Sequence, residues 1–148
     1  MEQDLKELKA FLDEKVAQYN NPKFIELDPI QIPHSYTVKE DIEISGFLAA
    51  TIAWGNRTSI VKNAKRMLAP MGESPYDFIC NHREHHLKRF DGFVHRTFNS
   101  LDLLTFIEGL KHLYKDKNGL EGIFVKYQTH DSLQPAIHEL KKEFLSQR

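Results

Sequence analysis

Apolar residues recur at three- and four-residue steps through most of this 148-residue chain. That spacing places them on one face of an α-helix. Stripes of this kind occupy residues 4–20, 60–68, 101–114 and 133–144. Alternation of apolar and polar residues, which marks a half-buried strand, extends over no useful length. The sequence therefore predicts an all-α fold, a compact bundle of about seven helices.

Local signals place several helix ends. Pro22 disfavours helical geometry in the residue before it, so the first helix is expected to end just ahead of this proline. Thr37 and Glu40 have the spacing of a capping box, which predicts that another helix begins there. Residues 42–54 are mostly apolar or small, so this helix is expected to be central and buried and to end at Gly55.

The segment between these two helices contains Pro29 and Pro33, which excludes a helix interior. Its isoleucines and leucine are too apolar for a free linker, so an extended segment lying against the core is expected. Residues 28–34 hold no nucleophile and base at a catalytic spacing. We expect this stretch to be structural, with lining of a cleft as the alternative.

Length and composition bound the class of protein. The length suits one domain over residues 1–148. Cys80 is the only cysteine, which rules out an internal disulfide and favours a cytoplasmic location. No apolar run approaches the roughly 20 residues of a membrane span, and the first 15 residues do not resemble a signal peptide. Glycine-rich phosphate loops and common catalytic motifs are missing, so no cofactor is expected.

Charge is distributed unevenly along the chain. Residues 1–37 hold 4 Lys and Arg against 7 Asp and Glu, a net charge of 4 − 7 = −3. Residues 57–96 hold 8 against 4, a net charge of 8 − 4 = +4. A basic middle segment would suit contact with a polyanion such as DNA. The alternative is that these side chains solvate the outer faces of helices.

The turn at residues 52–58 combines Trp54, the only tryptophan, with Asn56, Arg57 and Thr58. An aromatic face beside a guanidinium is suited to stacking on bases and contacting phosphate, and the free amides that open the next helix attract anions. The alternative interpretation is a core tryptophan that ends a helix, followed by a Gly-Asn turn.

A second mixed segment, residues 92–99, presents His95 and Arg96 between phenylalanines. Histidine and arginine together can hold a phosphate, the arginine in bidentate fashion. The alternative is that Arg96 bonds carbonyl groups at a helix end while Asn99 caps the following helix.

His82, His85 and His86 would share one face if residues 80–86 were helical, and imidazole is a common ligand of zinc or nickel. Further ligands at a familiar spacing are missing, and neighbouring Arg and Lys side chains would oppose a dication. We therefore expect a solvated polar face and no metal site, with a metal-dependent enzyme as a weaker third hypothesis.

Five blocks of the sequence together resemble an uncharacterised bacterial family that is catalogued as a domain of unknown function. They are DPIQIPH at 28–34, KEDIEISGFLAATIAWGNRTSIVKNA at 39–64, GESPYDF at 72–78, GFVHRTFN at 92–99 and GLEGIF at 119–124. The resemblance extends over nearly the whole chain, and the blocks occur in the same order.

That family is in turn distantly similar to the helix-hairpin-helix DNA glycosylases of base-excision repair. The resemblance implies a glycosylase-like helical bundle in which residues 47–58 correspond to a buried helix that runs into a turn before a basic helix. In those enzymes a side chain of this turn fills the gap left by a flipped base. Trp54 or Asn56 would occupy that wedge position. The C-terminal helix-hairpin-helix and its catalytic Asp are missing, which implies the N-terminal portion of a longer protein or a shortened relative, without an assignable catalytic residue.

Two function hypotheses follow, and catalytic activity stays open in both. The first is a DNA-binding helical domain whose contacts are Trp54, Asn56, Arg57, Thr58, Lys62, Lys65, Arg66, His95 and Arg96. The second is a protein-interaction or structural domain, with Trp54 buried and Lys and Arg spread over the surface. In that case an exposed apolar patch would receive a missing C-terminal region or a second copy of the chain.

Overall fold

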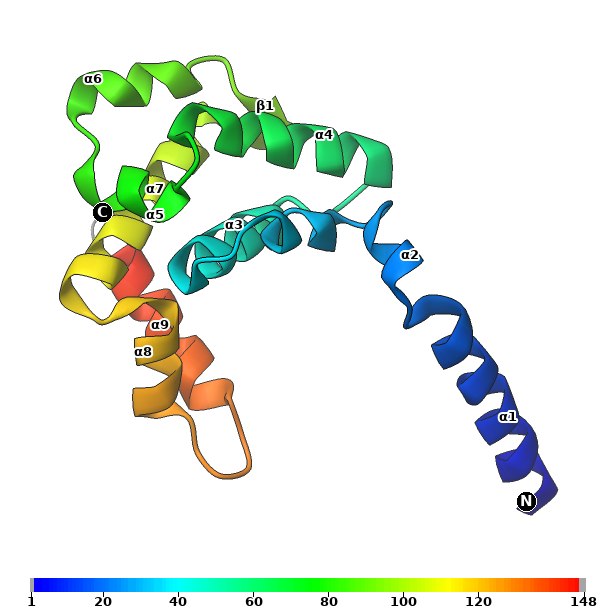
Figure 1. Cartoon of the computed structure of the whole chain (residues 1–148). Helices are drawn as coiled ribbons and strands as arrows, with labels where there is room; N and C mark the ends of the chain where they lie inside the picture. The colour runs from blue at the N-terminus through cyan, green and yellow to red at the C-terminus, as the bar shows by residue number, and fades with distance from the viewer. Residues whose placement is uncertain (1, 147–148) are drawn as a thin grey trace.

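The computed structural model describes residues 2–146 and is helical apart from one small hairpin (Figure 1). The helices among these residues are α1 (Glu2–Tyr19), α2 (Pro22–Ile25), α3 (Lys39–Thr51), α4 (Arg57–Leu68), α5 (Pro75–Asn81), α6 (Glu84–Leu87), α7 (Ser100–Asp116), α8 (Gly119–Tyr127) and α9 (Gln134–Leu145). The all-α class is confirmed. The count exceeds the expected seven because α2 and α6 are single turns, too short to produce an apolar stripe.

Helix α3 lies at the centre of the fold. Ile44 and Leu48 are fully buried among side chains of α7, where Leu103, Ile107, Leu110 and Leu113 are also fully buried. Helices α4 and α5 pack on other sides of α3, and α9 covers α7 and α8. None of the described helices has the length and hydropathy needed to cross a bilayer.

The start and the end of α3 both differ from the expectation. Val38, rather than Thr37, occupies the cap position, and no side chain bonds the first amides there, so the predicted capping box is wrong. Asp41, in the first turn, instead accepts hydrogen bonds from Ser74 Oγ (3.0 Å) and Tyr76 N (2.8 Å) of α5. The helix ends at Thr51, which leaves Trp54 in the turn that follows.

The proline-containing segment is not extended. It forms two short 3-10 turns, η1 (Pro29–Gln31) and η2 (Pro33–Ser35), each with proline at its start, where a missing N–H costs nothing. Asp28 begins the first turn by accepting a hydrogen bond from Ile30 N at 3.0 Å. Both turns pack on α3, and a Cβ at Gly46 would lie 3.5 Å from Pro33. The small residues of α3 therefore allow the proline turns to approach the helix closely.

A hairpin of two strands, β1 (Val94–His95) and β2 (Phe98–Asn99), interrupts the helices, with His95 opposite Phe98. Two residues a strand give no alternating pattern, which is why the sequence did not indicate it. The facing of two later helices also differs. Leu101 is 72% exposed and Ile137 is 55% exposed, although both were expected to face inward.

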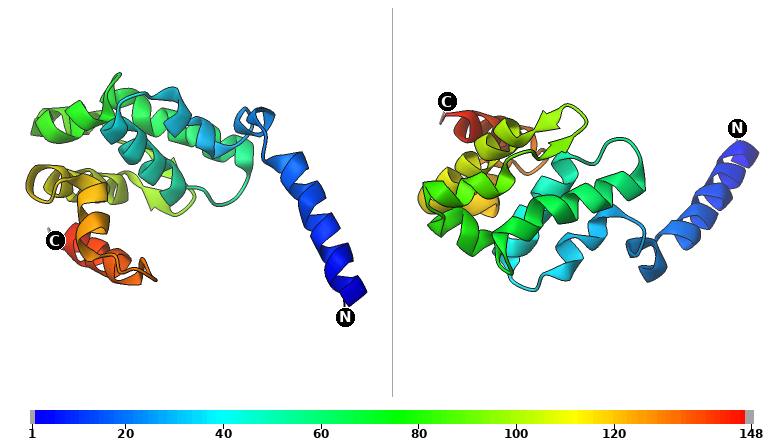
Figure 2. Two further views of the ribbon diagram at one scale, coloured as in Figure 1. Left: turned by 60° about the horizontal axis from the view of Figure 1, so that its bottom comes forward. Right: turned by 90° about the horizontal axis from the view of Figure 1, so that it is seen from above.

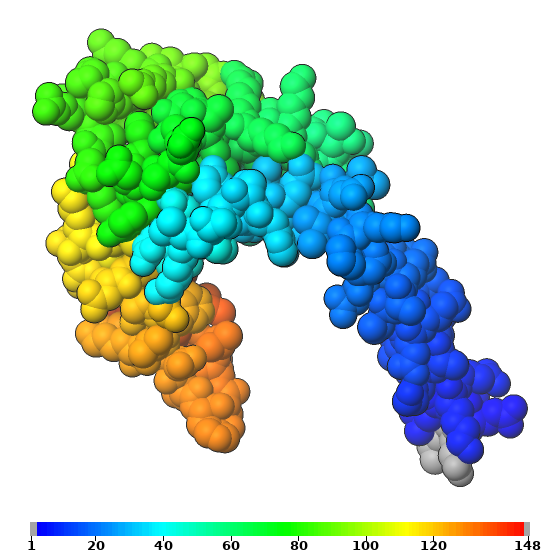
Figure 3. Space-filling model, viewed as in Figure 1, coloured from blue at the N-terminus to red at the C-terminus, as the bar shows by residue number. Residues whose placement is uncertain are grey.

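Helix α1 extends away from the other helices, as two views agree (Figures 1 and 2). Its limits match the expected helix to within two residues at each end. The apolar stripe that the sequence predicted along this helix is exposed. In the space-filling view α1 forms one leg of an arch whose other leg includes α8 (Figure 3).

Candidate nucleic-acid interface

The β1–β2 hairpin lies along α4 and reaches the turn between α3 and α4. Near the C-terminal end of the helix, Arg66 Nη2 donates to Gly92 O at 3.0 Å, and its guanidinium lies 5.7 Å from the Phe93 ring centre. One turn earlier, Asn63 Nδ2 lies 2.9 Å from His95 Nδ1. The two segments that the sequence singled out separately therefore meet at one surface.

His95 connects the hairpin to the Trp54 turn. An amide nitrogen can only donate, so His95 Nδ1 accepts from Asn63, and Nε2 carries the hydrogen directed at Trp54 O, 3.3 Å away. The side chain is 3% exposed, and both of its ring nitrogens are occupied. This arrangement makes His95 a positioning residue rather than the phosphate contact that the sequence suggested.

Trp54 stands at the surface. The residue is 39% exposed, and its ring meets the His95 ring edge-on, with centres 5.7 Å apart at 89°. The Arg96 guanidinium carbon lies 5.0 Å from the Trp54 ring centre, within the range of a cation–π interaction. An exposed indole is thus held between a buried imidazole and an exposed guanidinium.

Backbone geometry at two positions makes this contact possible. Arg96 has φ +56°, a left-handed conformation that is uncommon outside glycine, asparagine and aspartate. Gly55 has φ +107°, and a Cβ added to it would collide with Arg96 Nη1. Gly55 therefore makes the space for the guanidinium. The sequence indicated only a helix-ending role for this glycine.

Asn56, Arg57 and Thr58 are exposed but have different roles. Asn56 caps α4, because its Oδ1 accepts a hydrogen bond from Ser59 N at 3.1 Å. Thr58 lies in the first turn of α4, and its side chain forms no hydrogen bond within residues 2–146. Arg57 points away from the hairpin: its guanidinium lies 5.4 Å from the Phe24 ring centre, and Nε lies 4.0 Å from Asp28 Oδ2.

The cations of α4 divide between two sides of the helix. Lys62 and Arg66 are four residues apart, so they share the side next to the hairpin. Lys65 is displaced from Arg66 by about 100° around the helix and borders a hollow with Gln31 and Tyr36. Contacts within the turn and the hairpin involve Trp54, Arg66 and Arg96, and helix spacing adds Lys62. We call these four residues the indole surface. Arg57 and Lys65 lie outside it.

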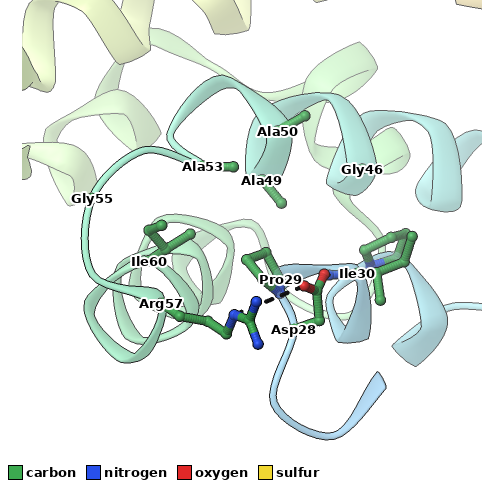
Figure 4. A pocket seen from close by; sticks show the side chains of 11 residues that line it. Asp28, Pro29, Ile30, Gly46, Ala49, Ala50, Ala53, Gly55, Arg57 and Ile60 are labelled. Carbon is green, nitrogen blue, oxygen red and sulfur yellow. Dashed lines mark hydrogen bonds and ion pairs between the residues drawn. The ribbon is translucent and has the colours of Figure 1, made fainter. Parts of the chain in front are cut away.

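A cleft of about 480 Å³ opens beside Arg57, between the proline turns and α3 (Figure 4). Its floor is formed by the small residues of α3 at positions 46, 49 and 50 and by Ala53, which follows the helix. Arg57 and Asp28 form an ion pair at its edge (Figure 4). The structure shows both roles that the sequence left open for the proline segment, because its turns pack on α3 and also line the cleft.

The three neighbouring histidines do not share a helix face, because α5 ends before His82 and α6 begins after it. His82 is buried, with Nδ1 near two carbonyl groups of α5 and Nε2 3.0 Å from Glu108 Oε1. Desolvation, followed by the proximity of His85, lowers the pKa of His86. Within residues 2–146, no three His, Cys, Asp or Glu side chains are placed to hold a metal ion.

Residues 28–148 match the model of a family described as a protein of unknown function, DUF2400. The chain belongs to the DUF2400 family. Within that match lie α3 and α4, the hairpin and the cleft, whereas α1 and α2 precede it. No curated protein and no solved structure matches the chain. For this DUF2400 chain the geometry of the indole surface is therefore the available guide to function.

Proposed function

We propose that this DUF2400 chain binds nucleic acid, and DNA in particular, through the indole surface. The observation that carries the proposal is the exposed Trp54 ring with the Arg96 guanidinium 5.0 Å from its centre. An exposed aromatic face offers a stacking platform for an unpaired base. A guanidinium beside it can bond phosphate oxygens in bidentate fashion.

The neighbouring charges support the same surface. Lys62 is exposed on α4, and Arg66 is exposed although one of its nitrogens bonds Gly92 O. Contacts from such side chains to phosphate supply most of the sequence-independent affinity for DNA. A purely structural domain was expected to bury Trp54. Its 39% exposure favours the binding hypothesis over that alternative.

We also propose a distant kinship with the helix-hairpin-helix DNA glycosylases. Its support is the order of elements: a buried helix, α3, an exposed turn, and a basic helix, α4. Within that turn Trp54 is the better wedge candidate, since the Asn56 side chain is engaged in capping α4. We assign no catalytic residue and propose binding alone.

The test is a fluorescence anisotropy titration of labelled duplex DNA containing an abasic site, with intact duplex and single-stranded DNA in parallel. The proposal predicts binding at about 50 mM salt that weakens steeply as salt rises. Trp54→Ala and Arg96→Ala should each weaken binding. Lys126→Ala is the matched control, because Lys126 is an exposed cation of another cation–aromatic pair, 4.9 Å from the ring centre of the half-buried Tyr127. Failure of all three DNAs to bind at low salt would refute the proposal.

A further inference from the structure

Helix α1 carries an apolar surface that no part of the described chain covers. Its large apolar side chains, each between 51% and 63% exposed, are Leu5, Leu8, Phe11, Leu12, Val16 and Tyr19. All of them except Phe11 fall within one narrow stripe along the helix. A single helix of 18 residues is marginal in water on its own, so an exposed stripe of this kind marks an interaction surface.

Contacts between the C-terminal end of α1 and the start of α2 fix the direction of the helix. Tyr19 packs edge-on against Phe24 of α2, with ring centres 5.9 Å apart. Asn21 accepts a hydrogen bond from Lys23 N at 3.1 Å and donates one to Gln18 O at 2.7 Å. These contacts all lie at the C-terminal end of α1, and the rest of the helix extends away from the other helices (Figures 2 and 3). Its apolar stripe is therefore exposed.

We propose that this stripe packs against the same stripe of a second copy of the chain, with the two helices antiparallel. The steps between successive stripe residues are 3, 4, 4 and 3, from Leu5 through Leu12 to Tyr19. This spacing reads the same in both directions about Leu12. A two-fold axis at Leu12 therefore brings Leu5 opposite the partner's Tyr19, which is the self-complementarity that a symmetric dimer requires.

The charges beside the stripe suit the antiparallel arrangement. Lys9 and Asp13 lie on the same flank and form an ion pair of 2.6 Å within the helix. In an antiparallel pair each flank faces the same flank of the other helix. The axis at Leu12 then places Lys9 near the partner's Asp13, about 3 Å apart along the helix axis. Unlike charges meet across the interface in both directions.

The size of the stripe sets the expected strength of the dimer. The five residues of the stripe, each exposed by half or slightly more, present on the order of 500 Å² on each helix, or roughly 1,000 Å² for the pair, the lower limit of a specific interface. An interface of this size is expected to dissociate in the micromolar range. The dimer should therefore form and dissociate with protein concentration.

The oligomeric state of the full chain tests the proposal. Light scattering after size-exclusion chromatography, from about 5 to about 300 µM, should show a shift from monomer to dimer. Leu12→Glu should abolish the dimer, because it places two carboxylates at the axis. Leu101→Glu is the matched control, since Leu101 is 72% exposed on α7, and this variant should dimerise as the parent does.

Disulfide trapping tests the orientation of the helices. In a Cys80→Ser background, which removes the only native thiol, Leu12→Cys should cross-link to itself under mild oxidation. Leu5→Cys and Tyr19→Cys should each cross-link poorly alone and efficiently when mixed. A chain that stays monomeric throughout, or a dimer that survives Leu12→Glu, would overturn the proposal. Efficient self-linking of Leu5→Cys would exclude the antiparallel arrangement.

Discussion

The guanidinium carbon of Arg96 lies 5.0 Å from the centre of the Trp54 ring, although the two residues belong to separate turns of the chain. The buried His95 holds these turns together, since it bonds both Asn63 and the Trp54 carbonyl. The surface on which the proposed function depends is therefore fixed by hydrogen bonds beneath it. Single substitutions can test the role of each of its residues separately.

Gly55→Ala should weaken both folding and DNA binding. The new Cβ would collide with Arg96 Nη1, and φ +107° is unfavourable for alanine, so we expect a loss of about 1–3 kcal/mol in the free energy of unfolding. Gly72→Ala is the control, because Gly72 also has a positive φ, +80°, but has open space around it. Urea titrations should show a loss of stability in both variants, because both substitutions place alanine at a positive φ, but only Gly55→Ala should also weaken DNA binding. DNA binding weakened equally in both variants would mean that the Arg96 contact contributes nothing.

Arg96→Asn should separate stability from binding. Asparagine adopts the left-handed conformation at φ +56° more readily than arginine, so the free energy of unfolding should stay level or rise by a few tenths of a kcal/mol. Loss of the guanidinium should nevertheless weaken DNA binding several-fold. Urea unfolding and anisotropy titrations measure the two effects. DNA binding as strong as that of the parent would exclude a contact between Arg96 and phosphate.

The two sides of α4 should differ in their salt dependence. If Lys62 and Arg66 contact phosphates, Lys62→Ala and Arg66→Ala should each lower the slope of log K against log salt by about 1. Lys65→Ala, one position from Arg66 but directed toward the hollow beside Tyr36, should leave the slope unchanged. Equal effects of all three variants would indicate a diffuse attraction to DNA rather than a defined surface.

Acid stability should depend on Glu143. Hydrogen bonds from His112 and then Lys117 hold the pKa of this carboxyl below its ordinary value of 4.5. A carboxyl with a lowered folded-state pKa contributes stability above its unfolded pKa, and this contribution is lost as pH falls through the folded value. Glu143→Gln should therefore reduce the drop in urea midpoint between pH 7 and about pH 3.

The control for this pH dependence is Glu139→Gln. Glu139 forms an ion pair with Lys142 of the same helix. This variant should retain most of the acid sensitivity of the parent. Glu143, in contrast, links α9 to His112 of α7. If Glu143→Gln and the parent lose stability identically on acidification, the link between α7 and α9 has no role in acid unfolding.

Local signals predicted much of the helical framework, because helix starts and apolar stripes depend on neighbours in sequence. Ser74 and Asn99 cap α5 and α7 as their sequences indicate. Thr37 does not cap α3, because the chain turns into the helix one residue later, at Val38. The exposure of the α1 stripe was equally beyond prediction, since an amphipathic pattern reveals an apolar face but not what covers it.

The sequence singled out both halves of the indole surface but could not show that they meet. Their contact depends on a hairpin with two residues in each strand, which leaves no periodic signal. The separation of Lys65 from Arg66, in contrast, could have been predicted. Once Ile60 and Met67 are assigned to the core, the helical repeat places Lys65 and Arg66 on different sides of α4. Gly55 was identified as a turn residue, and its clearance for Arg96 follows only from the fold.

The most direct test of the central claim uses Trp54, because it is the only tryptophan and reports on the indole surface alone. Iodide quenching of its fluorescence is measured at constant ionic strength, with and without abasic-site DNA. We predict strong quenching of the free chain, marked protection when DNA is added at low salt, and loss of that protection in Arg96→Ala. Quenching that DNA leaves unchanged, at concentrations where anisotropy shows binding, would contradict the account.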